Sequence, residues 1–446
     1  MEISVRQPAP QGSAGGPAPI TTSGLSGLAQ GGTPLWLPLP FLLTGVAGAA
    51  LFGALLPFVA PQALLAPGFP HVLALVHTAT LGWLTMTIMG ASLQLAPVIL
   101  VSPLRAARFT PAQYPLYLLG VALLISGFWL MNIPLLITGG SLVLLAVAHY
   151  VVILSMTIAR ATTRPLTSRY LMAAMLYLCV VVSLGFTAAL NFQLGFLGAG
   201  VTRLLLAHIT AGVVGWLTCM LIGVSYTLTR MFALVHDHTD DLGRRVFLLL
   251  NAGVVGLATG FGFGWVWLQA LGGLSLVTAV WLFAYDYRRM LRVRKRKPLD
   301  VTQRHTIAAV GYLVVTVTAG VAVALFGGGQ EPVLVALGLA AFVGWLGQST
   351  IGYLYKIVPF LIWQSRYGPL AGRQRVPLMR DLVHQRAASL SFWLINGALP
   401  LALVCALLNW VFPLQIAAAF LGVGLIIAAA NVIGVVVPRA PITSPA

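Results

Sequence analysis

The chain has 446 residues, of which 59% are hydrophobic and only 7% are charged. Soluble domains usually carry about 25% charged residues, so too few charges are present to cover a water-facing surface. This composition excludes a soluble globular protein and makes the lipid bilayer the solvent for most of the chain. The net charge of +17 does not indicate a nucleic-acid partner, because membrane proteins retain Lys and Arg in cytoplasmic loops.

The first 33 residues are rich in Gly, Pro, Ser and Ala, and they lack a basic segment followed directly by an apolar core. Such a segment cannot bury enough apolar surface to fold, and it does not have the pattern of a signal peptide. We expect a disordered cytoplasmic tail over 1–33, one transmembrane domain over 34–438 and a short cytoplasmic tail over 439–446.

Twelve apolar runs follow, and each approaches the roughly 20 residues that a membrane-crossing helix needs. No ten-residue alternation of polar and apolar side chains appears, so the fold class is an all-α polytopic membrane protein. Two pairs of runs have almost no linker, so each pair could be miscounted. The runs lie near 35–59, 70–100, 113–131, 133–158, 169–193, 202–232, 244–266, 268–288, 303–325, 331–361, 390–409 and 412–437.

The basic residues test this count. With the amino terminus inside, the tails and even-numbered loops carry almost all Lys and Arg, and only Arg203 falls outside. This segregation predicts a multi-pass protein of the cell (inner) membrane with both termini in the cytoplasm. The run from Arg288 to Lys297 is interpreted as a topology anchor at anionic lipid head groups, and a site for a specific partner is the alternative.

A Gly-Trp-Leu step recurs on the second, sixth and tenth runs, with glycine seven residues after each tryptophan. The Trp-to-Trp spacings are 133 and 129 residues, or four helices each, which predicts three four-helix pseudo-repeats around a threefold axis. Glycine two turns from tryptophan lets a backbone or a flat cofactor approach closely. The steps are Gly82-Trp83, Gly215-Trp216 and Gly344-Trp345, with Gly90, Gly223 and Gly352; Gly264-Trp265 is off the period.

Histidines at membrane depth are candidate functional residues. His77 lies about 7 residues into the second run, roughly 10 Å below its outer end at 1.5 Å per residue, and His208 has a similar depth in the sixth. Two imidazoles on equivalent helices suit iron or copper, although hydrogen bonding to a carbonyl is the alternative. His71 is expected at the outer boundary and His149 toward the cytoplasmic end. The others, His236, His238, His305 and His384, are expected in or beside cytoplasmic loops, with a solvated loop favoured over a metal site around His236 and His238.

On these features the chain resembles the catalytic subunit I of haem-copper oxidases and nitric-oxide reductases. The segment 77–97, HTATLGWLTMTIMGASLQLAP, is similar to the second helix of divergent members. The resemblance implies that His77 is an axial ligand of a low-spin haem b and that His208 is a copper ligand. The chain departs from the family elsewhere, because 244–266 has no His-His pair, 331–361 has no histidine and Gly212 replaces a tyrosine.

Full oxygen-reductase activity is therefore not expected, and whether the chain is an enzyme stays open. Our first hypothesis is a membrane protein that binds haem, copper or both, in respiration, nitric-oxide handling or metallocentre assembly. The second is a non-redox scaffold or accessory subunit of the same fold, and the third is a small-molecule transporter. Gln348 on the tenth run could line a polar cavity, with helix–helix hydrogen bonding as the alternative. The expected partners are the lipid bilayer and other membrane subunits, with no nucleic acid.

Overall fold

The computed structural model describes residues 33–104 and 109–437. In these residues the secondary structure is helical, apart from one isolated bridge between Ala371 and Gln374. Twelve helices are long and apolar enough to cross a membrane, which confirms the predicted count. The spans are Pro38–Leu65, Pro70–Leu100, Thr110–Trp129, Ile133–Ala159, Leu166–Leu194, Gly198–Ala233, Asp241–Phe263, Val266–Arg292, Val301–Phe326, Glu331–Arg366, Gln385–Leu407 and Val411–Gly434. The tails predicted for 1–33 and 439–446 lie almost entirely outside the described residues.

The two closely spaced pairs of runs are separate helices. Between α5 (Gln113–Trp129) and α6 (Ile133–Ala159) the chain reverses through Met131, which has a φ of 52°. Asn132 then caps α6 by accepting a hydrogen bond from the Leu135 amide at 3.0 Å. Between α10 (Asp241–Phe263) and α11 (Val266–Arg292) the reversal uses Gly264, with a φ of 74°. Glycine adopts this left-handed conformation without steric cost, so two residues suffice for the turn.

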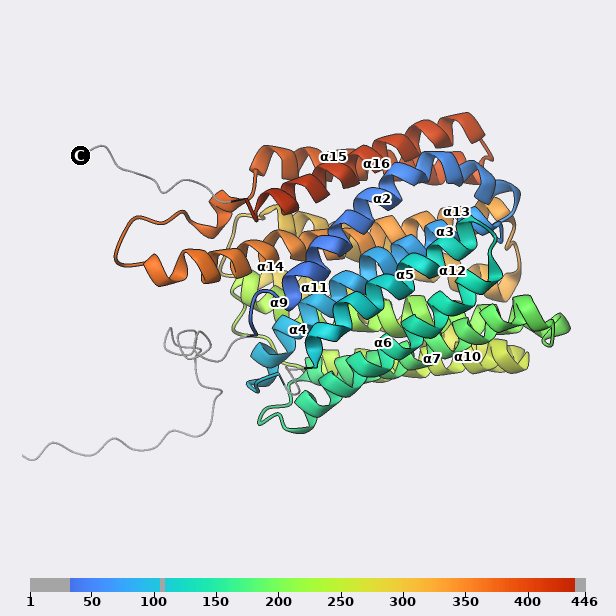
Figure 1. Ribbon diagram of the computed structural model, residues 1–446, viewed down its shortest axis with the longest axis horizontal. Helices are drawn as coiled ribbons and strands as arrows, with labels where there is room; N and C mark the ends of the chain where they lie inside the picture. The colour runs from blue at the N-terminus through green and yellow to red at the C-terminus, as the bar shows by residue number, and fades with distance from the viewer. Residues whose placement is uncertain (1–32, 105–108, 438–446) are drawn as a thin grey trace, which may run out of the picture.

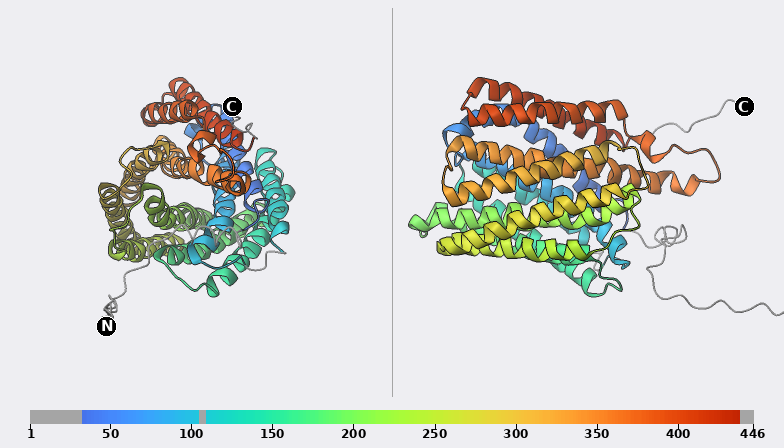
Figure 2. Two further views of the ribbon diagram at one scale, coloured as in Figure 1. Left: turned by 90° about the vertical axis from the view of Figure 1, so that its left-hand side faces the viewer. Right: turned by 180° about the vertical axis from the view of Figure 1, so that it is seen from behind.

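The second, sixth and tenth spans form the interior of the bundle (Figures 1 and 2). Their most apolar windows are 67%, 61% and 78% buried, whereas no other span exceeds 50%. Lipid covers an apolar helix face as well as protein does, so the burial itself, and not hydropathy, identifies these three spans as the inner layer. The outer spans are α2 (Pro38–Leu65), α5, α6, α7 (Leu166–Leu194), α10, α11, α12 (Val301–Phe326), α15 (Gln385–Leu407) and α16 (Val411–Gly434).

Each inner span contains a π-helical segment that includes its Gly-Trp step. The segments are η1 (Thr78–Thr85), η4 (Thr210–Thr218) and η5 (Ala340–Gly347). The segment η1 lies between α3 (Pro70–His77) and α4 (Met86–Leu100). The segment η4 lies between α8 (Val201–Ile209) and α9 (Cys219–Ala233), and η5 lies between α13 (Glu331–Leu339) and α14 (Gln348–Arg366). Insertions of this kind are rare and are frequent at functional sites, so their recurrence on the three inner spans singles these spans out.

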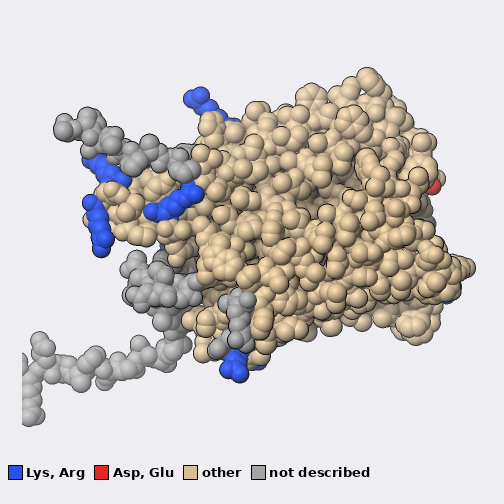
Figure 3. All heavy atoms as spheres, viewed as in Figure 1, with Lys and Arg blue, Asp and Glu red and all other residues tan. Residues whose placement is uncertain are grey.

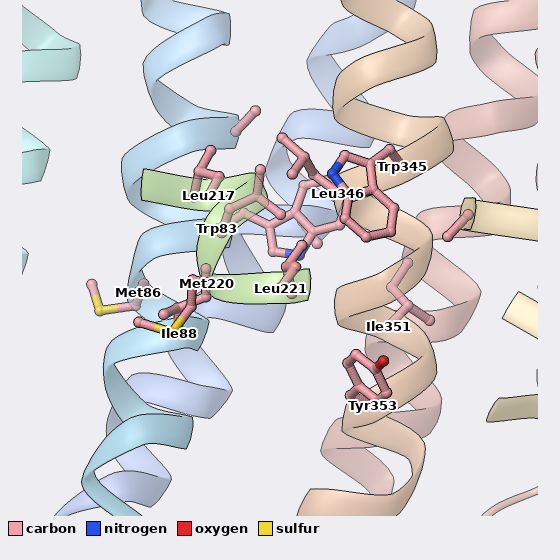
Figure 4. Close-up of a cluster of buried hydrophobic side chains, with 14 of the residues drawn as sticks. Trp83, Met86, Ile88, Leu217, Met220, Leu221, Trp345, Leu346, Ile351 and Tyr353 are labelled. Atoms are coloured by element: carbon pink, nitrogen blue, oxygen red, sulfur yellow. The ribbon is translucent and has the colours of Figure 1, made fainter. Parts of the chain in front are cut away.

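Two of the three tryptophans donate hydrogen bonds between inner spans. The indole N–H of Trp216 donates to the Thr85 hydroxyl at 2.9 Å, and that of Trp345 donates to the Thr218 hydroxyl at 2.9 Å. Each acceptor lies two residues after the tryptophan of the preceding inner span. Figure 4 shows Trp83 and Trp345 within a cluster of buried hydrophobic side chains.

The third such contact lacks an acceptor. Two residues after Trp345 the chain has Gly347, which has no hydroxyl group, and the Trp83 indole N–H is buried without a hydrogen-bond partner. A Cβ atom built on Gly347 would lie only 2.6 Å from Cη2 of the Trp83 ring. The indole ring thus fills the space that a side chain at position 347 would need.

Lys and Arg concentrate at one end of the bundle. Apart from Arg203, every Lys and Arg in the described residues lies at the end that carries the connections 160–165, 234–240, 293–300 and 367–384. In the face that Figure 3 shows, the blue side chains gather at this end. We call it the basic end; α2 begins there and α16 finishes there.

Candidate functional site: histidines of the second and sixth spans

His77 is the last residue of α3 and directly precedes the π-helical segment η1. Its Nδ1 lies 2.8 Å from the carbonyl oxygen of Leu73, one turn earlier in the same helix. A carbonyl oxygen can only accept, so Nδ1 carries the proton and the Nε2 lone pair is free. The ring stacks on Phe128 of α5 with 4.9 Å between centroids, which fixes its orientation.

His208 lies in α8, two residues before η4, and its ring packs against the neighbouring helix α7. Its Nδ1 lies 3.0 Å from the carbonyl oxygen of Val181, so this imidazole has the same tautomer as His77. A Cβ atom on Gly185 would lie 2.8 Å from Cε1 of the His208 ring. Glycine at position 185 is therefore what allows the ring to rest on the α7 backbone.

The two imidazoles have similar surroundings. Both are half-buried, and each lies on an inner span at or just before its π-helical segment. In metal proteins, a ligating histidine usually donates its second ring nitrogen to a carbonyl or carboxylate, as both rings do here. Each of the two sequence-predicted site residues thus has an Nε2 lone pair available.

Neither histidine belongs to a cluster of three ligands in the described part of the chain. Among residues 33–104 and 109–437, no group of three or more His, Cys, Asp or Glu side chains could hold a metal ion. The tenth span has no histidine, so a haem on His77 would find no second imidazole there. The residues present fit a site with one or two imidazole ligands, and they do not fit an oxidase centre with a three-histidine copper.

His71 and His149 have other partners. His71 Nδ1 lies 3.1 Å from Oε1 of Gln62, near the end of the second span that is opposite the basic end. His149, on α6, has its Nδ1 2.7 Å from Oε1 of Gln113. These side-chain hydrogen bonds between helices account for both histidines without a cofactor.

His305, which was expected in or beside a cytoplasmic loop, lies in the helix that follows the loop 293–300. It lies in the second turn of α12, fully buried, with Nδ1 3.2 Å from Oε1 of Gln348 on α14. Asn396 of α15 donates from Nδ2 to the Phe392 carbonyl oxygen at 2.9 Å and to the same Oε1 of Gln348 at 2.8 Å. The Oε1 atom of Gln348 therefore accepts from both Asn396 and His305. Gln348 thus takes part in helix–helix hydrogen bonding.

The sequence marks the start of the helix that contains His305. Asp300 and Gln303 form a capping box, in which the Asp300 side chain accepts from the Gln303 amide at 3.2 Å and the Gln303 side chain accepts from the Asp300 amide at 2.9 Å. This D-x-x-Q spacing marks a helix amino terminus. It starts the ninth span at residue 301, two residues before the predicted run, and places His305 in the second turn.

His238 was expected in a solvated loop, and the structure shows it packed against the bundle. Its side chain is 5% exposed, and Nε2 lies 3.2 Å from Oδ1 of the fully buried Asp286 on α11. Burial lowers the pKa of the His238 imidazole below its ordinary 6.5, and the Arg230 and Arg289 guanidinium groups lower it further, against an opposing effect of Asp240. The neutral imidazole is thus the form that the folded loop favours.

A pH dependence follows for the loop 234–240. Because the folded pKa is lowered, the stabilisation from His238 is complete above about pH 6.5 and is lost as the pH falls below it. We expect backbone amides of 234–240 to exchange faster at about pH 5.5 than at about pH 7.5, after correction for intrinsic rates. In His238→Gln the corrected rates should be equal at the two pH values; an unchanged pH response in that variant would assign it to another group.

A cavity of about 60 Å³ lies between the inner spans, on the side of the tryptophans toward the basic end. It is lined by three residues that each follow an inner tryptophan by five positions, Ile88, Leu221 and Thr350, and also by Tyr353. His77 and His208 are not among its lining residues. The cavity and the histidines are therefore separate features of the interior.

In comparisons with known proteins, no protein-family model matches the chain and no curated protein matches it significantly.

Proposed function

We propose that the chain is a membrane protein that binds haem b or copper through His77 and His208 on a scaffold like subunit I of haem-copper oxidases. The observation that carries this proposal is the shared state of the two imidazoles. Both have Nδ1 bonded to a backbone carbonyl and Nε2 free, and both lie beside a π-helical segment. His77 is the proposed haem ligand and His208 the proposed copper ligand.

The scaffold in this proposal consists of three four-helix units around a pseudo-threefold axis. Three glycines, each seven residues after an inner tryptophan, support it by packing on the preceding outer span of their own unit. A Cβ atom on Gly90 would lie 2.7 Å from Cβ of Phe41, and one on Gly352 would lie 3.0 Å from Cβ of His305. Gly223 contacts Cβ of Tyr170 in the same way. The tryptophan–threonine hydrogen bonds between units add a second repeated contact.

A bound haem or copper would supply electron transfer or bind a small ligand, and the residues of the chain would hold and orient it. The chain lacks the further histidines of an oxygen-reducing centre, so oxygen reduction is not part of the proposal. A role in respiration, nitric-oxide handling or metallocentre assembly remains within it. These roles share one requirement, which is a stoichiometric metal centre.

The test is the metal content of protein purified from a haem-replete host with copper supplied. We expect a b-type haem spectrum, stoichiometric copper, or both. A colourless protein without copper would overturn the proposal. Solute flux in proteoliposomes made from such colourless protein would then favour a transporter, and its absence would favour a non-redox scaffold.

The proposed orientation places the basic end in the cytoplasm, because Lys and Arg are retained on that side. Alkaline phosphatase is active only after export, so a fusion after residue 446 should be inactive, and a fusion in the 327–330 connection should be active. The reverse pattern would show that the basic end faces outward. Activity at both positions would mean that the number of spans is odd.

A further inference from the structure

One face of α11 changes from apolar to basic toward the basic end. Trp281 and Tyr285 are 55% and 58% exposed, and the exposed Arg288, Arg289 and Arg292 continue the same face at helical spacing. Aromatic side chains of this kind mark the membrane–water interface, and the arginines then reach the level of the lipid head groups. The Arg289 guanidinium lies 6.0 Å from the centroid of the Tyr285 ring.

The chain beyond α11 is held in place by the end of the sixth span. The Lys295 amide donates to the Leu234 carbonyl oxygen at 3.2 Å, and the Arg296 amide donates to that of Ala233 at 3.3 Å. Arg294 bonds through its guanidinium to the carbonyl oxygens of Leu291 and Lys297. This segment is therefore fixed. We call its exposed basic side chains and those of α11 the basic corner: Arg288, Arg289, Arg292, Lys295, Arg296 and Lys297.

The side chains of the basic corner form no ion pair within the described part of the chain. Of the two acids nearest in sequence, Asp286 is fully buried beside His238, and Asp300 pairs with Lys356 at 2.6 Å. Six positive charges thus face solvent and head groups together.

The neighbouring helix α12 extends this surface. The Trp281 indole N–H donates to the Thr318 hydroxyl at 3.2 Å, which joins the outer faces of α11 and α12. Ile307 and Val315 are exposed on α12, and the exposed Arg304 lies at its basic end. Apolar surface at membrane depth below a set of cations is complementary to a phospholipid with an anionic head group.

We propose that the basic corner binds anionic phospholipid head groups, with the acyl chains lying along the outer faces of α11 and α12. Free polyanions would not use the aromatic and aliphatic side chains that continue the surface into the membrane. The site therefore prefers phosphatidylglycerol to phosphatidylcholine, which has the same chains and a neutral head group. This inference does not depend on the proposed metal site.

The test uses the full chain in nanodiscs with equal amounts of the two lipids, and native mass spectrometry counts the lipids retained on release. We expect phosphatidylglycerol to be enriched on the wild-type protein, and added salt to reduce the enrichment. The triple variant Arg288→Gln, Arg289→Gln, Arg292→Gln should lower the enrichment at least about tenfold, because each such residue contributes on the order of 1 kcal/mol.

The matched control is Arg373→Gln, Arg375→Gln, Arg380→Gln, which removes the same charge from exposed positions at the same end. It should keep the wild-type preference. Equal losses in the two triple variants would reduce the effect to net charge and overturn the proposal. So would equal retention of the two lipids by the wild-type protein, a measurement that needs no variant, or displacement of phosphatidylglycerol by a short DNA duplex at equal charge.

Discussion

Replacing His77 with Ala should reduce haem occupancy at least about tenfold, to the background of the preparation. The loss is nearly complete because an axial imidazole is removed and the tenth span has no histidine that could replace it. His208→Ala should lower copper content more than haem content, since its imidazole is the proposed copper ligand. Visible spectra and metal analysis of the purified variants measure both quantities.

The control is His149→Ala. This imidazole is bonded to Gln113 in the part of α6 toward the basic end, away from the proposed site. The His149→Ala variant should keep haem and copper at wild-type levels, although it loses a helix–helix hydrogen bond of about 1 kcal/mol. If the three variants lose the cofactor equally, the loss reports general misfolding. If His77→Ala keeps the full haem spectrum, another residue is the ligand.

The spans could be predicted because the physics is local. Every backbone polar group in the hydrocarbon core must be bonded within its own segment, so each long apolar run becomes a helix. The short reversals at Met131 and Gly264 did not merge helices, because a left-handed residue needs only two or three positions to turn the chain. Hydropathy therefore predicted the number of spans correctly, and the short turns kept neighbouring spans as separate helices.

The candidate site was predicted less completely. The sequence placed His77 and His208 at similar depth, but it could not give their tautomers, which depend on the carbonyls of Leu73 and Val181. Val181 is 27 residues from His208 in the sequence, and only the packing of α7 brings its carbonyl oxygen near the imidazole. The contact of His238 with Asp286 is equally non-local, and no spacing rule would have predicted it.

The recurring Gly-Trp steps were visible in the sequence, but their geometry was not. A π-helical segment depends on a shift of backbone hydrogen bonds that composition does not encode. The sequence also suggested three equivalent steps, whereas Gly347 leaves the Trp83 indole N–H without the hydroxyl acceptor that Trp216 and Trp345 have. The third contact thus departs from the repeated pattern.

Gly422→Ala should destabilise the protein, although Gly→Ala inside a helix usually stabilises by about 0.5–1 kcal/mol. Gly422 lies where α16 crosses α2, so the last span packs on the first. A Cβ atom there would overlap the Gly53 carbonyl oxygen and lie 2.9 Å from its carbonyl carbon. Backbone cannot move aside as a side chain can, so we expect a cost at or above the usual overpacking range of about 1–3 kcal/mol.

Gly434→Ala is the matched control, because it makes the same change in the same helix where no atom lies within 4 Å of the added Cβ. It should leave the free energy of unfolding unchanged or raise it slightly. Thermal unfolding of both variants in one detergent measures the difference, and the Gly422→Ala transition should come at the lower temperature. Equal transition temperatures would mean that α2 and α16 separate easily, and that the contact between the first and last spans does not close the bundle.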